Sequence, residues 1–170
     1  DFIDYISDLE LGGFIYRDFT WSFSGKESRL SQLRISDNYV RFYLKYIFPR
    51  KSRIEKRSIK LSETLSFLQW STVFGFQFEN MILNNTDKLI DLLQIPNAEI
   101  LQLGPYFQTG TKIRPGVQID FLIQCKKSTL HLCEIKSGSK IGKEAIVEVQ
   151  NKIKRLRVPK GFSIRPQLIY

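Results

Sequence analysis

The first fifty residues alternate between helical and strand-like hydrophobic patterns. The predicted elements are a helix over 2–12, a hairpin of strands near 14–16 and 33–35, and an aromatic helix over 37–48. Gly25 lies in the middle of the polar hairpin sequence, and Pro49 is expected to end the second helix. This order predicts either a winged-helix segment that lacks its first helices or a small helical cap packed on a larger domain.

The rest of the chain changes from helical to strand-like periodicity and back. Ser62 is expected to cap a short segment that runs through Phe67 and Trp70. The elements predicted after it are helices over 71–83 and 87–93, strands over 99–108, 117–125 and 129–136, a helix over 143–156 and a strand over 162–170. The order αβββαβ predicts an α/β domain over 62–170. A winged-helix-like segment over 1–48 and a linker over 49–61 precede it.

Composition excludes several classes of protein. Apolar residues make up 42% of the 170 residues, which is enough for packed cores. The longest apolar runs are far shorter than a membrane span requires, so we expect a cytoplasmic protein with no membrane partner. Cys125 and Cys133 form no CxxC pair and have no His at metal-ligand spacing. The sequence therefore indicates neither a disulfide framework nor a zinc site.

Charge points to a polyanionic partner. The net charge is +9, and the predicted linker contains six basic residues against one acid. Such an excess favours nucleic acid, because basic side chains neutralise phosphates and release counterions, although a solubilising charge is the alternative. The residues expected to contact nucleic acid are Arg50, Lys51, Arg53, Lys56 and Arg57 of the linker, with Lys140 and Lys143 of a basic turn near Gly142.

Three charged residues interrupt two apolar strands. Glu134 and Lys136 project from the same side of one strand, because side chains alternate between faces. A three-residue turn over 126–128 places Asp120 of the preceding strand directly opposite Glu134, and Asp120 is then expected to share a face with Gln118 and Leu122. Two converging carboxylates with a nearby ammonium suit phosphodiester hydrolysis with bound magnesium. An ordinary surface cluster is the alternative, but charges inside buried strands need an explanation.

Two polar residues interrupt apolar helical stripes. Glu79 has Gly75, Phe76, Ile82 and Leu83 three and four positions away, so it lies within an apolar stripe. A carboxylate there is costly to desolvate unless a cation or metal pairs with it. Gln150 lies between Ile146 and Ile153 on the last predicted helix, and either a satisfied amide or a site residue explains it.

The pattern of these residues resembles the PD-(D/E)XK nuclease superfamily, whose fold is the restriction-endonuclease-like αβββαβ core. More narrowly, it resembles the C-terminal domain of a family of archaeal and bacterial AAA-type ATPases. The segments that carry the narrower resemblance are Trp70-Ser71-Thr72, Phe78-Glu79-Asn80, Gln118-Ile119-Asp120-Phe121-Leu122-Ile123 and Leu132-Cys133-Glu134-Ile135-Lys136. The segment 34–43 is similar to the end of the winged-helix region that precedes that domain.

The resemblance implies roles for individual residues. Asp120, Glu134 and the Ile135 carbonyl would bind Mg²⁺ or Mn²⁺, Glu79 would be a supporting ligand, and Lys136 would be the catalytic lysine. Gln150 would complete the site, although related nucleases often place an aromatic residue one turn later, where this chain has Lys154.

The function that follows is a metal-dependent nuclease acting on nucleic acid, with DNA preferred, in a larger ATPase. The chain has no Gly-x-x-x-x-Gly-Lys-Ser/Thr motif and hence no nucleotide site of that kind, so the ATPase module would lie upstream. The alternatives are a non-catalytic module, which binds nucleic acid or holds the ATPase in an oligomer, and a protein-interaction domain whose charge is incidental.

Overall fold

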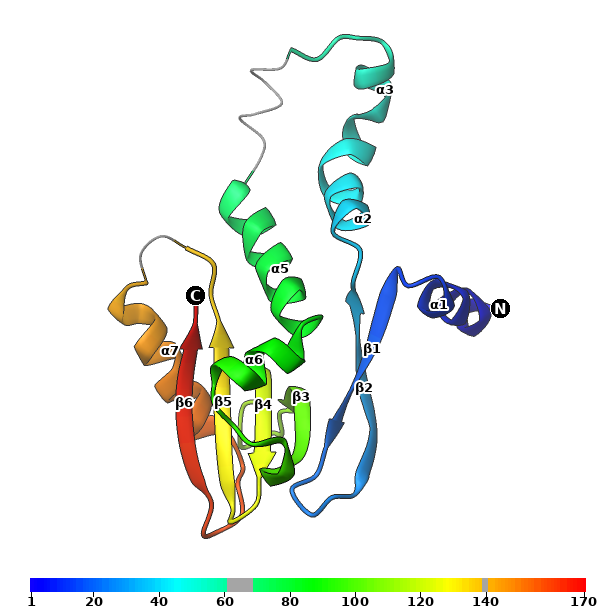
Figure 1. The fold of residues 1–170 in the computed structure, drawn as a ribbon. Coiled ribbons are helices and arrows are strands. Elements are labelled where there is room, and N and C mark those ends of the chain that lie inside the picture. The colour runs from blue at the N-terminus through cyan, green and yellow to red at the C-terminus, as the bar shows by residue number, and fades with distance from the viewer. Residues whose placement is uncertain (61–68, 139–140) are drawn as a thin grey trace.

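The computed structural model describes residues 1–60, 69–138 and 141–170, and shows a mixed α/β protein with two sheets (Figure 1). The larger sheet has the strand order β3-β4-β5-β6, in which β3, β4 and β5 are antiparallel neighbours and β6 pairs with β5 in parallel. The smaller sheet is the hairpin β1–β2. No helix in the described ranges combines the length and the apolar character needed to cross a membrane.

The predicted elements are confirmed over most of the chain. The N-terminal elements are α1 (Phe2–Leu11), β1 (Ile15–Trp21), β2 (Glu27–Ile35), α2 (Asn38–Phe42), the π-helical turn η1 (Tyr43–Ile47), the 3₁₀ turn η2 (Phe48–Arg50) and α3 (Lys51–Glu55). The later elements are α5 (Trp70–Leu83), α6 (Thr86–Leu92), the 3₁₀ turn η3 (Asn97–Glu99), β3 (Ile100–Gln108), β4 (Val117–Cys125), β5 (Thr129–Ile135), α7 (Lys143–Arg155) and β6 (Ser163–Ile169). The segment predicted from Ser62 through Phe67 and Trp70 lies outside the described residues up to residue 68, and Trp70 begins α5.

Pro49 does not end the second helix, so that prediction was wrong. Asp37 caps α2 as expected, its side chain accepting a hydrogen bond from Val40 N at 2.7 Å. The backbone then passes through η1 into η2, where Pro49 stands in the first turn, and on into α3. Proline needs no hydrogen-bond partner for its nitrogen in a first turn, so a new helical turn can begin there. Much of the predicted linker is therefore helical.

Helices cover both faces of the larger sheet. On one face Phe121 and Ile123 of β4 pack with Leu89 and Ile90 of α6, and Phe78 of α5 packs against the same cluster. On the other face, Leu122 of β4 and Leu130 and Leu132 of β5 pack with Val149 of α7 and with Leu156. Figure 1 shows the resulting three layers, with the sheet between α6 and α7. Both faces of β4 and β5 are thus buried, as their nearly continuous apolar runs predict.

The N-terminal hairpin packs against the edge of the larger sheet. Thr20 Oγ1 of β1 donates to the Phe107 carbonyl at 2.8 Å and accepts from the Phe107 amide at 3.3 Å. Trp21 contacts Tyr106 edge to face, with ring centroids 4.9 Å apart. The Gln124 side chain also donates to the Phe23 carbonyl at 3.2 Å. These contacts place the hairpin beside β3, where it forms one wall of the cleft described below.

Asn80 of α5 joins the large sheet's helical layer to the hairpin and α2. Its side chain is 2% exposed; the amide oxygen accepts from Arg34 at 2.6 Å, and the amide nitrogen donates to Asn38 Oδ1 at 2.8 Å. The same nitrogen lies 3.1 Å from the Ser36 carbonyl. A buried amide with this many partners fixes the position of α5 relative to β2 and α2.

We expect Asn80→Ala to destabilise the protein by about 2–3 kcal/mol, because it leaves the Arg34 guanidinium and backbone groups without buried partners. Chemical denaturation measures the change. Asn151→Ala, on the exposed face of α7, is the matched control and should change stability by less than about 0.5 kcal/mol. A similar stability for both variants would show that Asn80 does not hold the two parts together.

Candidate functional site

A bulge in β4 positions Asp120. Gly104 of β3 pairs with Leu122, but two residues later Tyr106 pairs with Ile119, so β4 contains one extra residue between these pairs. The register with β5 runs regularly from Cys125 opposite Thr129 to Phe121 opposite Cys133. A bulge redirects the side chains next to it and ends regular pairing. Beyond Phe121, a side-chain hydrogen bond replaces the backbone hydrogen bonds between the strands. Asp120 Oδ2 accepts a hydrogen bond from the Ile135 amide at 2.8 Å.

The predicted register of β4 and β5 is confirmed. Residues 126–128 form the predicted turn, in which Lys127 and Ser128 adopt positive φ values of 57° and 54°. Continuing the observed register by one residue sets Asp120 opposite Glu134. Gln118 and Asp120 line the same cleft, but the prediction that Leu122 shares their face was wrong: Leu122 packs with Ile119, because the bulge breaks the alternation.

Glu134 lies inside the protein between two lysines. Its side chain is 1% exposed; Oε1 lies 3.0 Å from Lys136 Nζ, and Oε2 lies 2.5 Å from Lys152 Nζ. Burial raises the pKa of Glu134, the Asp120 charge raises it further, and the hydrogen bonds from the two lysines oppose both. Burial acts to lower the pKa of Lys136, but its hydrogen bonds to Glu148 and Glu134 outweigh burial, so the pKa is raised.

Two residues of this cluster, Lys152 and Glu148 of α7, were missed by sequence reasoning. Lys152 Nζ lies 3.5 Å from Asp120 Oδ1 as well as close to Glu134. Glu148 accepts from Lys136 at 2.9 Å, and this hydrogen bond lowers the Glu148 pKa. A signal for Lys152 was present in the sequence, since it continues the apolar stripe of Ala145, Val149 and Leu156 at helical spacing.

Gln150, in contrast, is exposed and does not join the cluster. The reason is that the stripe of α7 that faces the sheet runs through Val149 and Lys152. On the neighbouring stripe Ile146 is 57% exposed and Gln150 is exposed, and only Ile153 packs partly against the core. The expectation that Gln150 lies between buried apolar residues was therefore wrong.

Glu79 and Asp120 both line a cleft of about 430 Å³ between the hairpin, α5 and the large sheet. Arg34 and Arg41 line the same cleft, and so does Asp18, which forms an ion pair with Arg34 at 3.1 Å. Burial raises the pKa of Glu79, and the charge of Asp120 raises it further, while the two arginines and Lys152 lower it. Within the described part of the chain, the Glu79 carboxylate has no hydrogen bond or ion pair. As predicted, it does not lie on a fully solvated face.

The donors around Asp120 suit a hard divalent cation in chemistry, because Glu79, Asp120 and Glu134 all offer carboxylate oxygens. Among the described residues, however, no three His, Cys, Asp or Glu side chains lie close enough to form a metal-binding group. Lys152 stands between Asp120 and Glu134, where a cation bound by both would lie. A magnesium or manganese ion held by both carboxylates would require that ammonium to move. The contact predicted for the Ile135 carbonyl stays a prediction.

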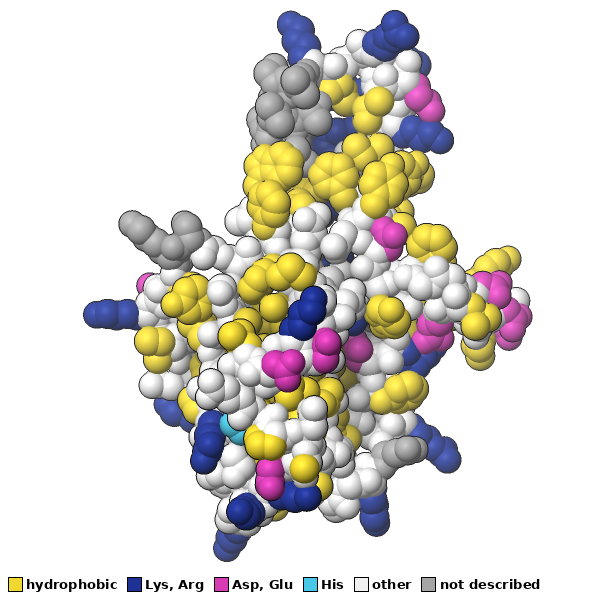
Figure 2. All heavy atoms as spheres, viewed as in Figure 1, with side chains coloured by type: hydrophobic (Ala, Val, Ile, Leu, Met, Phe, Trp, Pro, Cys, Tyr) yellow, Lys and Arg dark blue, Asp and Glu magenta, His cyan; other side chains and the backbone are white. Residues whose placement is uncertain are grey.

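The predicted nucleic-acid contacts lie at a distance from this cluster. Lys51, Arg53, Lys56 and Arg57 are exposed at the end of the arm formed by α2, η1, η2 and α3, and Arg50 is half-buried. Figure 2 shows Lys and Arg side chains at the tip of that arm and hydrophobic side chains below them. Lys143 is exposed at the start of α7, and Lys140 lies outside the described residues.

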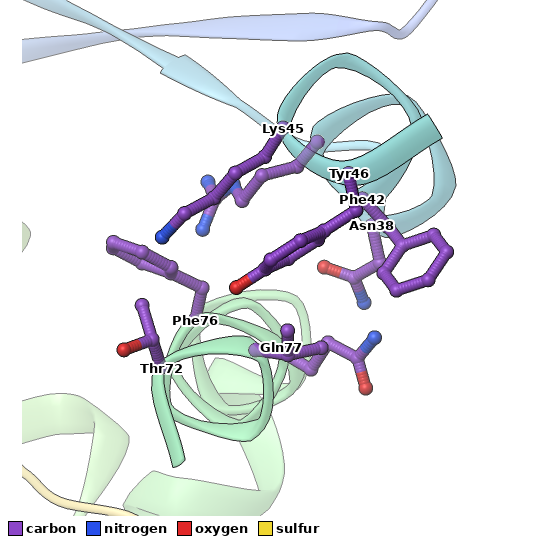
Figure 3. Close-up of a pocket in the computed structure, with 9 residues that line it drawn as sticks. Asn38, Phe42, Lys45, Tyr46, Thr72, Phe76 and Gln77 are labelled. Atoms are coloured by element: carbon purple, nitrogen blue, oxygen red, sulfur yellow. The ribbon is translucent and has the colours of Figure 1, made fainter. Parts of the chain in front are cut away.

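The arm is held against α5 by aromatic contacts. The Arg41 guanidinium lies 4.3 Å from the centroid of the Phe76 ring, and the Arg41 side chain also donates to the Ile35 carbonyl at 2.7 Å. One turn further along, Tyr46 is buried, and Figure 3 shows its ring extending from the arm toward Thr72 and Phe76 of α5. These contacts fix Arg41 at the rim of the cleft.

Comparison with known proteins gives one similar sequence. Over 113 residues, or 66% of this chain, the protein is 28% identical to an uncharacterized protein, MJECL04, of Methanocaldococcus jannaschii. The matched region spans about a quarter of the length of that relative, 25%. No family model matches the chain. No solved structure matches it either.

The raised pKa of Glu79 predicts how stability depends on pH. A carboxyl whose pKa is above its ordinary value of 4.5 in the folded protein prefers to be protonated there, so stability is lost as pH rises through the folded pKa. Glu79→Gln removes this loss. In chelator-treated protein we expect the variant to melt higher than the parent at pH 7 and to lose that advantage below about pH 4.5. Glu55→Gln, at an exposed site on α3, is the control and should show no such trend.

Proposed function

We propose that this protein contains a divalent-metal-dependent nuclease site in a restriction-endonuclease-like core, with nucleic acid, and DNA in particular, as its substrate. One observation carries the proposal. Asp120 and Glu134 come together where β4 and β5 stop pairing, and Lys136 forms an ion pair with Glu134. Burying acidic groups at the separating ends of two strands lowers the stability of the fold, so charged residues are rarely buried there. Groups with perturbed pKa values gather at functional sites.

Each residue has a distinct part in the proposed site. Asp120 and Glu134 would hold Mg²⁺ or Mn²⁺, with Glu79 joining from the opposite wall and Ile135 through its carbonyl. When bound, such an ion polarises the phosphate and lowers the pKa of a bound water. Lys136 holds one oxygen of Glu134 and supplies positive charge beside the reacting phosphate.

The arginines that line the cleft support the proposal of a phosphodiester substrate. Arg34 and Arg41 line the cleft with Asp120, and each is held by contacts that leave some of its N–H donors for a ligand. A guanidinium held in place in this way is suited to phosphate oxygens. The basic residues at the tip of the arm extend the positive charge away from the cleft, as a polyanion longer than one nucleotide would require.

A specific observation favours a second candidate function. Lys152 satisfies both Asp120 and Glu134, so the acid cluster has a counter-ion without any metal. A non-catalytic module that binds nucleic acid, or that holds an upstream ATPase in an oligomer, would have this arrangement. Cleavage and metal binding distinguish it from the nuclease.

Asp120→Asn and Lys136→Met should act on different steps. Removing a metal ligand is expected to weaken Mn²⁺ binding and abolish cleavage together. Removing the lysine is expected to leave Mn²⁺ binding in place and slow cleavage by ~10²–10³. Calorimetric titration with Mn²⁺, beside a cleavage assay on plasmid and single-stranded DNA, measures both. Asp91→Asn and Lys154→Met, on exposed helix surfaces, are the matched controls. A parent protein that neither binds Mn²⁺ nor cleaves DNA would contradict the nuclease and leave the non-catalytic module.

The arm should supply phosphate contacts. Replacing Lys51, Arg53 and Lys56 together with Ala is expected to reduce the slope of log affinity for duplex DNA against log salt by about 2–3, since each lost phosphate contact reduces the slope by about 0.9. The control removes the same charge elsewhere, with Lys88, Lys126 and Lys160 changed to Ala. Equal slopes in the two triple variants would show that the arm does not contact phosphate and that total charge accounts for the affinity.

A further inference from the structure

Lys152 reaches the acid cluster from the helix on the opposite side of the sheet from α5. Its side chain is 17% exposed, and its Nζ lies 2.5 Å from Glu134 Oε2 and 3.5 Å from Asp120 Oδ1. The ammonium thus contacts one oxygen of each carboxylate. A divalent ion shared by Asp120 and Glu134 would need the same position, so the ammonium and the ion exclude each other.

We propose that Lys152 is the resident counter-ion of the acid cluster, and that a divalent cation enters by displacing its ammonium. The inference rests on the proposed function in one respect, since it takes Asp120 and Glu134 to be the metal ligands. It adds a positioning residue that sets how strongly the site binds metal. Lys136, which contacts Glu134 and Glu148, remains beside the site when the exchange occurs.

The charges of the cluster support this exchange. Asp120, Glu134 and Glu148 contribute three negative charges, and Lys136 and Lys152 contribute two positive charges. Without Lys152 the three acids would face a single ammonium. Glu134 is almost fully buried, so the repulsion between it and Asp120 would be poorly screened. A bound divalent ion would replace the lost charge, and for this reason the lysine and the ion are alternatives.

A displaced Lys152 has a second partner within reach. Glu148 Oε1 lies 3.9 Å from Lys152 Nζ, one turn earlier on α7, and the Glu148 side chain is 45% exposed. Rotation of the lysine toward Glu148 keeps an ion pair while it vacates the space between Asp120 and Glu134. This second partner makes displacement less costly than for a buried lysine that has no other acid nearby.

The first experiment uses Lys152→Met, which keeps the apolar stem and removes the charge. We expect the variant to bind Mn²⁺ about tenfold or more tightly than the parent in calorimetric titrations, because the competing cation is gone. We also expect it to melt lower than the parent in chelator and to recover with Mn²⁺. Lys154→Met is the matched control on the exposed face of the same helix. Lys152→Arg retains the charge and should keep the affinity of the parent within a few-fold.

A second experiment uses the unaltered protein, so it does not depend on how a variant folds. An amine-reactive reagent followed by mass spectrometry reports how accessible each lysine is. Mn²⁺ should increase the labelling of Lys152 several-fold and leave Lys154 unchanged. In Asp120→Asn, which lacks a proposed ligand, Mn²⁺ should have little effect on Lys152.

The outcomes separate this inference from the proposed nuclease. If the parent cleaves DNA with Mn²⁺ but Lys152→Met binds Mn²⁺ no more tightly and Lys152 labelling does not respond, the counter-ion role is wrong and the nuclease stands. If Lys152→Met gains affinity while the parent does not cleave, the counter-ion role stands and the nuclease is wrong. Absence of Mn²⁺ binding in both proteins overturns both.

Discussion

The burial of the Asp120 and Glu134 carboxylates beside each other is the constraint on which the site depends. Glu134 is enclosed by the sheet and α7, so its charge must be balanced by groups that reach it from neighbouring elements. Lys136 does so from its own strand, and Lys152 does so from α7. The position of α7 on the sheet is therefore an electrostatic requirement as well as a consequence of apolar packing.

The pairing of β4 with β5 ends beside the same pair of carboxylates. The extra residue in β4 bends the strand near the point where its pairing with β5 ends. The Asp120 carboxylate accepts a hydrogen bond from the Ile135 amide, which would otherwise have no partner there. This opening leaves Asp120 accessible from the cleft while Glu134 stays inside. Asp120 thus lines the cleft with Lys152 as its partner, and Glu134 is held inside by Lys136 and Lys152.

The hairpin and α2 complete the cleft from outside the large sheet. Asn80 holds Arg34 and the start of α2 in place, and Phe76 supports Arg41. The N-terminal residues therefore form a wall of the proposed site as well as a basic arm. This arrangement gives a physical reason for the two parts to act together on one polyanionic ligand, as proposed for the nuclease and for a module that binds nucleic acid without cleaving it.

Hydrophobic periodicity in the sequence determined the elements, their order and the pairing of Asp120 with Glu134, because a short turn and strict alternation constrain an antiparallel pair. It did not determine the bulge that redirected Ile119 or the helical turn at Pro49, which depend on contacts between distant residues. The sequence indicated the buried face of α7, because Lys152 lies within its apolar stripe, but it did not indicate which acids Lys152 contacts. Only the tertiary structure decided that Lys152, rather than Gln150, meets the acids, since a helix must be docked before its rotation relative to a sheet is known.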